Sequence, residues 1–375
     1  MTKRPVALIK AVASLLTSIF LIAGSSLASA QQAPSQQPPP WRAVYLPDGT
    51  VRAPEFELPP SNFLSPEGVM FLKMRAAMPA PPVMDGKLEI KDLRAGIENM
   101  MAPLVQMAKA RYPVTIEQEK IGGVPTSIIT PKDGIANENR ILINLHGGAF
   151  NSCAGACSLA ESIPIAAVGK IKVISVDYRQ GPEHVFPAAS EDVAMVYKAL
   201  LKKYKPKNIG IYGCSAGGAL TAQAAAWFQQ EKLPNPGAIG IFGAAAGRVG
   251  LGDSGYIAAR VDGAFPPPPL PGEAIQPQPF RSYFDGVDLK DPMVSPLTSP
   301  GILAKFPPTL LVTGTRAMDL SGAVYTHTQL VKAGVEGDLI VGEGLGHCYI
   351  MNPELPEARD AYDIITKFFD KHLGK

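Results

Sequence analysis

Apolar and polar positions follow two different patterns along the chain. Between residues 41 and 111 the apolar positions recur at helical spacing, most clearly from Leu93 to Met107. From Pro113 onward, short uninterrupted apolar runs such as Ile141–Leu145 alternate with helix-prone stretches. Uninterrupted apolar runs are typical of strands that are buried on both faces of a parallel sheet. The pattern therefore predicts a helical N-terminal region followed by an α/β domain.

The α/β part predicts about eight strands interleaved with helices. Two β-prone runs flank Gly122-Gly123 and predict a hairpin. The expected strands are 114–120, 124–130, 141–145, 171–176, 209–212, 238–242, 309–313 and 338–343. The expected helices are 188–204, 221–232, 321–333 and 356–372, and the proline-rich stretch 263–280 is expected to be a loop. This order predicts a mostly parallel sheet with helices on both faces.

Residues 41–111 form the helical region, ahead of an expected catalytic domain over 112–375. Helices are expected at 66–78 and 88–112, separated by a proline-rich break at 79–82. Their apolar positions include several methionines, which adapt to irregular surfaces. Two interpretations stay open: a helix that covers the core, or an N-terminal cap that walls a pocket for an acyl group.

The first 30 residues have the pattern of a secretory signal peptide. Basic residues at the start precede an uncharged apolar stretch over 11–23, and a small-residue cleavage site ends at Ala30. The apolar stretch is shorter than the roughly 20 residues of a membrane-spanning helix, so no stable membrane anchor is expected. We expect a secreted or periplasmic protein, with a disordered Pro/Gln linker over 31–40.

The net charge and the cysteines indicate which partners, disulfides and metals are to be expected. The formal net charge is +2 and no basic block is present, so nucleic acid is not an expected partner. Export would permit disulfides among the cysteines, although an even number does not establish pairing. Their spacing does not fit a zinc site, and no metal or cofactor is expected. The four cysteines are Cys153, Cys157, Cys214 and Cys348.

A strand, a sharp turn and a helix follow one another around Ser215. The apolar run Ile209–Tyr212 leads into Gly213-Cys214-Ser215-Ala216-Gly217, and an alanine-rich, helix-prone segment follows. A nucleophile elbow needs this order, with glycines where the turn is too sharp for side chains. A helix N-terminus at the serine would favour developing negative charge. Ser215 is therefore the candidate nucleophile; the alternative is an ordinary strand-to-helix turn.

A glycine pair follows the expected strand 141–145. In His146-Gly147-Gly148-Ala149-Phe150, two adjacent glycines leave backbone N–H groups free to bind an anion. An acyl-transfer intermediate needs such donors, together with the N–H of the residue after the nucleophile. The expected oxyanion-hole donors are Gly147, Gly148 and Ala216. The alternative is a glycine-rich turn without a catalytic role.

A histidine downstream of the serine is needed as general base. His347 follows the last expected strand, and the carboxyl ends of parallel strands lie at one edge of the sheet. His146 belongs to the oxyanion loop and is expected to be structural. The other three histidines lie on expected helices or their approaches: His184, His327 and His372. His347 is therefore the candidate base.

These motifs resemble the hormone-sensitive-lipase-like α/β-hydrolases, the esterases and lipases of the His-Gly-Gly type. The resemblance covers about residues 110–375 and implies an α/β-hydrolase fold, a Ser-Asp-His triad, a helical cap and short acyl esters as substrates. It also implies that 177–179 brace the oxyanion loop. The motifs are 145–150, Asp177-Tyr178-Arg179 with 182–183 and 186–189, 213–218, Pro292-Met293-Val294-Ser295-Pro296, and His347.

The chain departs from this family at the position of the triad acid. The family's aspartate aligns with Ala317, and Asp319 lies two residues later. An acid orients the histidine and stabilises the imidazolium. Asp319 is the only acid in that loop and is the candidate; a dyad or another acid remains open. Asp338 is the next candidate, but it should begin a strand at the far edge of the sheet.

A second departure concerns the residue before the serine, where the family has an acid and this chain has Cys214. Catalysis requires Ser215 and His347 to be close, so Cys214 and Cys348 should also be close. A Cys214–Cys348 disulfide is therefore a hypothesis; the alternative is two small buried thiols. Cys153 and Cys157 could pair across a tight loop or remain free.

The sequence predicts a serine esterase that hydrolyses short-chain carboxylic esters through an acyl-enzyme. The partner is a small-molecule ester, and nothing in the sequence indicates an oligomeric state. Two alternatives remain: an exported polysaccharide acetyl esterase, and a non-catalytic ligand receptor on the same fold.

Overall fold

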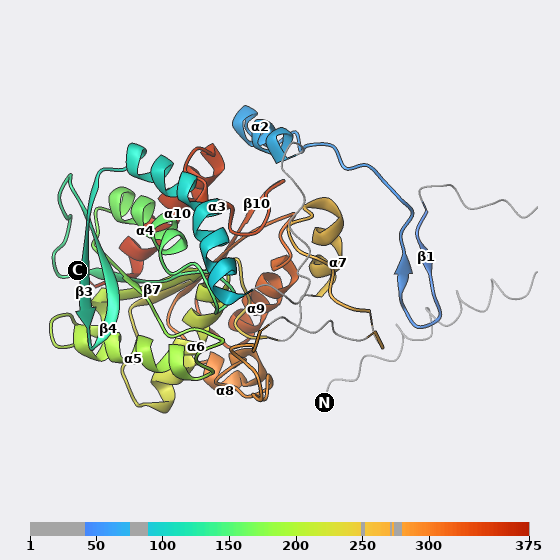
Figure 1. Cartoon of the computed structure of the whole chain (residues 1–375). Coiled ribbons are helices and arrows are strands. Elements are labelled where there is room, and N and C mark those ends of the chain that lie inside the picture. The colour runs from blue at the N-terminus through green and yellow to red at the C-terminus, as the bar shows by residue number, and fades with distance from the viewer. Residues whose placement is uncertain (1–41, 76–88, 249–251, 271, 274–279, 375) are drawn as a thin grey trace, which may run out of the picture. The chain divides into compact units, whose positions relative to one another are not determined.

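The computed structural model describes residues 42–75, 89–248, 252–270, 272–273 and 280–374 (Figure 1). The expected signal peptide and linker, the end of the helix expected over 66–78, and the break at 79–82 lie outside these residues. The chain divides into two units, Met1–Leu58 and Pro59–Lys375. In the first, β1 (Val44–Tyr45) pairs with β2 (Val51–Arg52) in a short antiparallel hairpin, which the sequence did not indicate.

The second unit is built on one eight-stranded sheet, which confirms the expected α/β-hydrolase architecture. The strand order is β10-β9-β8-β7-β5-β6-β4-β3; the β3–β4 and β4–β6 pairs are antiparallel, and the other pairs are parallel. The strands are β3 (Val114–Ile121), β4 (Val124–Pro131), β5 (Ile141–Leu145), β6 (Val173–Val176), β7 (Ile209–Cys214), β8 (Ala238–Phe242), β9 (Thr309–Gly314) and β10 (Gly337–Gly342).

Helices cover both faces of this sheet (Figure 1). Ile143 of β5 packs into one apolar cluster and Leu142, its neighbour, packs into the other, as the alternation of side chains along a strand requires. The first cluster includes side chains of α5 (Ala188–Leu200), α6 (Ala216–Gln230), α8 (Pro300–Leu303) and α9 (Leu320–Lys332). The second includes side chains of α3 (Ile90–Arg111), α4 (Ala156–Gly169) and α10 (Pro356–His372).

Helix α4, which contacts several strands of the sheet, was not predicted from the sequence. Ten of its residues are buried, so its sequence carries almost no polar face and no helical period. It also contains Pro164, which argues against a helix in a single sequence. The short α7 (Gly252–Val261) was missed as well.

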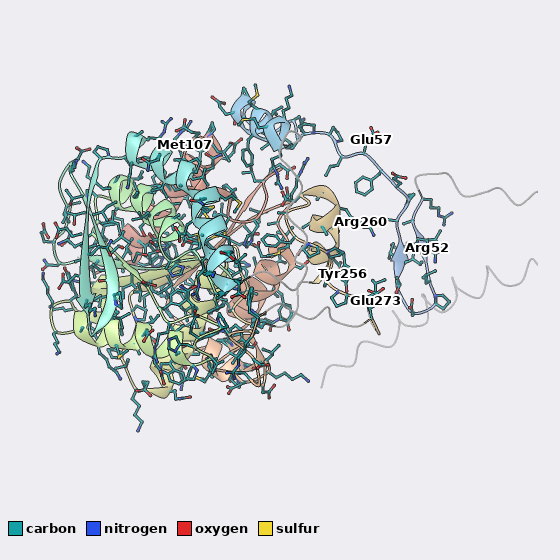
Figure 2. All side chains as sticks on the ribbon, in the orientation of Figure 1. Arg52, Glu57, Met107, Tyr256, Arg260 and Glu273 are labelled. Atoms are coloured by element: carbon teal, nitrogen blue, oxygen red, sulfur yellow. A yellow bond between two sulfur atoms is a disulfide. The ribbon has the colours of Figure 1, made fainter. Side chains whose placement is uncertain are left out.

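The N-terminal helices α2 (Pro66–Arg75) and α3 pack against the second apolar cluster. Met101 of α3 is buried in the second cluster, whereas Met100 and Met107 are exposed. Figure 2 labels Met107 on this helix. The same helix holds a loop beside the glycine pair, because Arg94 Nε donates to the carbonyl of Asn151 at 2.7 Å. One face of α3 therefore covers the core and supports this loop.

No helix within the described ranges is both long enough and apolar enough to cross a membrane.

Candidate active site

Ser215 occupies the sharp turn between β7 and α6. Its backbone has φ 59° and ψ −122°, a conformation that L-residues rarely adopt and that a nucleophile elbow requires. The turn is tight enough that a Cβ added at Gly217 would overlap the carbonyl of Leu145. The Ser215 N–H donates to the carbonyl of Phe242 at 2.9 Å, which fixes the turn against β8. The structure thus places Ser215 at the carboxyl edge of the central strands.

His347 and Asp319 form a hydrogen-bonded pair at the same edge of the sheet. Nδ1 of His347 lies 2.6 Å from Oδ1 of Asp319, and both side chains are largely buried. The second carboxylate oxygen, Oδ2, accepts a hydrogen bond from Thr313 Oγ1 at 2.5 Å. Asp319 therefore reaches the histidine despite its two-residue shift. Asp338 pairs with Leu310 near the amino ends of β10 and β9, at the opposite edge from His347.

A disulfide ties the histidine loop to the elbow. Cys214 and Cys348 are bonded, with their Cα atoms 6.2 Å apart, so the residues next to them, Ser215 and His347, are held close. A Cβ added at Gly243 would lie 3.0 Å from Cys214 Sγ and 3.3 Å from His347 Cε1. The structure also bonds Cys153 to Cys157.

The second ring nitrogen of His347 is not hydrogen-bonded to the serine hydroxyl in the described part of the chain. Nε2 instead lies 3.6 Å from Cys348 Sγ. In the absence of substrate, the hydrogen bond between nucleophile and base is often long and tightens when substrate binds.

The structure corrects the expected donor set of the oxyanion loop. The Gly147 N–H donates to Oε1 of Glu161 at 2.8 Å, so it cannot also bind an oxyanion. Within the described residues, the next two N–H groups, those of Gly148 and Ala149, have no acceptor. Ala216 is the first residue of α6, where backbone N–H groups lack a partner within the helix. The available donors are therefore Gly148, Ala149 and Ala216.

The sequence did not identify Ala149 as a donor, because amino-acid composition does not show which of several consecutive backbone N–H groups is free. Gly148 (φ 111°), Ala149 (φ 54°) and Phe150 (φ 63°) all have positive φ, which turns the loop back on itself. Two adjacent glycines indicate a loop of this kind, but the choice of donor depends on the distant Glu161.

Comparison with known proteins agrees with this geometry. Residues 142–351, more than half of the chain, match a family described by the α/β-hydrolase fold. The chain belongs to the α/β-hydrolase family.

Three similar proteins define the branch of the family. The crystal structure of esterase E25 is 30% identical, with a TM-score of 0.72, covering 86% of this chain and 99% of that one. An esterase from the bacterial hormone-sensitive lipase family is 25% identical, with a TM-score of 0.65, covering 82% of this chain and 97% of that one. An esterase from Acinetobacter venetianus is 26% identical over 276 residues, 72% of this chain and 88% of its own length. These similarities support a hormone-sensitive-lipase-like hydrolase that acts on esters.

Aromatic side chains brace the oxyanion loop of this hydrolase, as the resemblance implied. Tyr178 Oη donates to the carbonyl of His146 at 2.7 Å, and the two rings stack with centroids 4.3 Å apart. Burial lowers the pKa of His146 to about 4, so its ring is neutral at neutral pH. Phe150 stacks on Tyr283, with centroids 5.0 Å apart. His146 therefore has a structural role and does not serve as the base.

A cavity of about 590 Å³ is lined by residues of α3, the β3–β4 hairpin and α5. Charged side chains line it, among them Arg94, Asp177 and Arg179, and it contains none of Ser215, Asp319 and His347. The candidate active site is therefore identified by its hydrogen bonds rather than by this cavity.

Removing the Cys214–Cys348 bond should destabilise the hydrolase more than removing the Cys153–Cys157 bond. In the chain-entropy account, a bond across 134 residues constrains the unfolded chain by about 5 kcal/mol, and a bond across four residues by about 2 kcal/mol. We expect Cys214→Ala with Cys348→Ala to lower both the melting temperature and ester hydrolysis, because the His347 loop loosens. Circular dichroism melts of the two double variants make the comparison.

Non-reducing peptide mapping provides the chemical control for this prediction. Recovery of alkylatable Cys214 from unreduced protein would contradict the bond, as would equal melting temperatures for wild type and the Cys214/Cys348 double variant.

Proposed function

We propose that this hydrolase is a serine esterase in which Ser215 is the nucleophile, His347 the general base and Asp319 the acid that orients it. The observation that carries the proposal is the His347–Asp319 pair, which a disulfide holds beside the elbow of Ser215. Because Asp319 accepts a hydrogen bond from Nδ1–H, the other ring nitrogen, Nε2, remains free to accept a proton.

The chemistry proceeds in two acyl transfers. Ser215 Oγ attacks the ester carbonyl carbon while its proton moves to Nε2 of His347. The carbonyl oxygen becomes negative and is bound by the N–H groups of Gly148, Ala149 and Ala216. The intermediate collapses, and the alcohol leaves with the proton from Nε2. Water then attacks the acyl-enzyme, again with His347 as base, and the carboxylic acid is released.

Substrates with short acyl groups are part of the proposal, and the resemblance to the hormone-sensitive-lipase-like family supports them. Hydrolysis of p-nitrophenyl esters from acetate to palmitate tests this, with acetylated xylan as a polysaccharide arm. We expect the highest kcat/KM with the shortest chains. A maximum at long chains would contradict the short-chain assignment, and activity confined to acetylated xylan would favour the polysaccharide esterase.

A fluorophosphonate probe separates the esterase from a non-catalytic receptor. The probe should label Ser215 covalently, because only an activated serine displaces fluoride from phosphorus at a useful rate. An unlabelled, correctly folded protein without activity on any of these esters would contradict the proposed function.

A further inference from the structure

Glu161 is a buried carboxylate within the almost entirely apolar helix α4. Only 4% of the residue is exposed, and no cation pairs with it in the part of the chain that the structure describes. Burying an unpaired carboxylate costs several kcal/mol unless hydrogen bonds satisfy it. The burial of Glu161 therefore requires a specific explanation.

Three N–H donors satisfy this carboxylate, and they come from both halves of the candidate active site. Oε1 accepts from the Gly147 N–H at 2.8 Å, and Oε2 accepts from the Cys214 N–H at 3.2 Å. Oε2 also accepts from Asn144 Nδ2 at 2.9 Å, and Asn144 is in turn oriented by Ser175. One side chain thus connects the oxyanion loop to the strand that ends at the nucleophile.

We propose that Glu161 is a positioning residue that holds the oxyanion loop and the nucleophile elbow in register. The proposal rests on the proposed esterase function. The Gly147 hydrogen bond fixes the His146–Gly147 peptide group, which directly precedes the peptide group that carries the Gly148 N–H, and so sets the direction of the donors that follow. The two halves are in contact here: a Cβ added at Gly147 would lie 3.1 Å from the carbonyl oxygen of Cys214 and 3.4 Å from Ser215 Cβ. A shift of the loop would therefore displace its donors relative to the serine.

This positioning role requires a carboxylate rather than an amide at residue 161. An ionised carboxylate only accepts hydrogen bonds, which matches three donors. A glutamine offers one oxygen, and its NH₂ group would face at least one of the N–H groups of Gly147 and Cys214. The substitution Glu161→Gln keeps the size of the side chain and should break the hydrogen bond to the N–H of either Gly147 or Cys214.

Ionisation of Glu161 gives the proposal a signature in the pH profile. Burial raises the pKa of Glu161 to about 8, against the opposing effect of its three hydrogen bonds. The titratable groups around it keep their charge state near this pH, since burial lowers the pKa of His146 to about 4 and raises the pKa values of Tyr178 and Tyr212 well above 10. We therefore expect kcat to rise through about pH 8, because only the ionised carboxylate accepts hydrogen bonds from all three donors.

Stability should change in the opposite direction. The pKa of Glu161 is higher in the folded protein than the ordinary 4.5 of the unfolded chain. Unfolding therefore releases its proton between about pH 4.5 and 8, and the contribution of this group to the free energy of unfolding falls as the pH rises through that window. A catalytic gain near pH 8, at the upper end of the window in which stability is lost, distinguishes Glu161 from a residue that only supports the fold.

The experiment measures kcat and KM for p-nitrophenyl butyrate between about pH 5.5 and 9.5 in wild type, Glu161→Gln and Glu98→Gln. We expect Glu161→Gln to lower kcat by about 10- to 100-fold, to leave KM within about threefold, and to remove the rise near pH 8. Glu98 is the matched control, because its carboxylate accepts from the N–H groups of Gly155 and Ala156 at the start of the same helix. Glu98→Gln should keep the wild-type kcat and the rise near pH 8.

The outcomes separate this inference from the proposed function. Wild-type protein that neither hydrolyses esters nor reacts with fluorophosphonate would overturn the function itself. Active wild type together with a Glu161→Gln variant of unchanged kcat, or with a change in KM alone, would overturn the role of Glu161. If Glu161→Gln does not fold, the wild-type profile decides: an active enzyme whose kcat does not rise near pH 8 overturns the proposal.

Discussion

Replacing Ser215 by alanine should reduce kcat for ester hydrolysis by about 10⁴-fold or more and abolish labelling by fluorophosphonate. The alanine leaves no oxygen to attack the carbonyl carbon, and no acyl-enzyme can form. The elbow itself should persist, because the turn is fixed by the Ser215 backbone N–H and by the flanking glycines. Steady-state hydrolysis of p-nitrophenyl butyrate, together with a melting curve, provides the measurement.

The double replacement of Ser215 and His347 shows whether the two residues act as a unit. His347→Ala should cost nearly as much as Ser215→Ala, and the double variant only slightly more. Ser158→Ala is the control, since Ser158 is a buried serine whose Oγ donates to the carbonyl of Gly155, outside the candidate site. Wild-type turnover in Ser215→Ala, or fully additive losses, would exclude the proposed mechanism.

Replacing Asp319 by asparagine should lower kcat by about 10⁴-fold while the fold persists. Thr313 Oγ1 donates to Oδ2 of Asp319, and in the variant this hydroxyl needs the one remaining oxygen as its acceptor. The NH₂ group would then face Nδ1 of His347, which makes Nδ1 an acceptor and places the proton on Nε2. A histidine in that tautomer cannot take the proton of Ser215.

Asp338→Asn is the matched control for this prediction, because Asp338 lies on the edge strand β10 and should leave kcat unchanged. Measurement of kcat and KM for both variants decides the role of Asp319. A loss smaller than about tenfold for Asp319→Asn would assign the acid elsewhere, since errors of tautomer cost far more.

The sheet could be predicted from the sequence because its strands are uninterrupted apolar runs. β5, β7, β8 and β9 are buried along their whole length, and only strand boundaries shifted, as where the strand expected from Ile171 begins at Val173. Helix α4 escaped prediction for a related reason: burial on almost all sides removes the polar face that makes a helix recognisable.

The candidate site likewise contains residues that could be predicted from the sequence and residues that could not. Ser215 and His347 stand in local motifs, so their positions could be predicted from neighbouring residues. The choice of oxyanion donors depends on a contact between Gly147 and Glu161, which only the tertiary structure brings together. The position of Asp319 against His347 likewise depends on the path of the loop after β9, where Ala317 is buried and Asp319 directly precedes α9.

The order of the site along the chain has a consequence for biosynthesis. The elbow and the oxyanion loop are complete once α6 has been synthesised, but the proposed orienting acid, Asp319, and the proposed base, His347, follow β9 and β10, about 90 to 120 residues after the end of α6. Once Ser215 has been synthesised, the nascent chain therefore completes most of its remaining elongation before His347, the proposed base that would remove the proton, is added. The ability to cleave esters is among the last properties that the polypeptide acquires, so the ribosome-bound chain should be inert toward the esters around it.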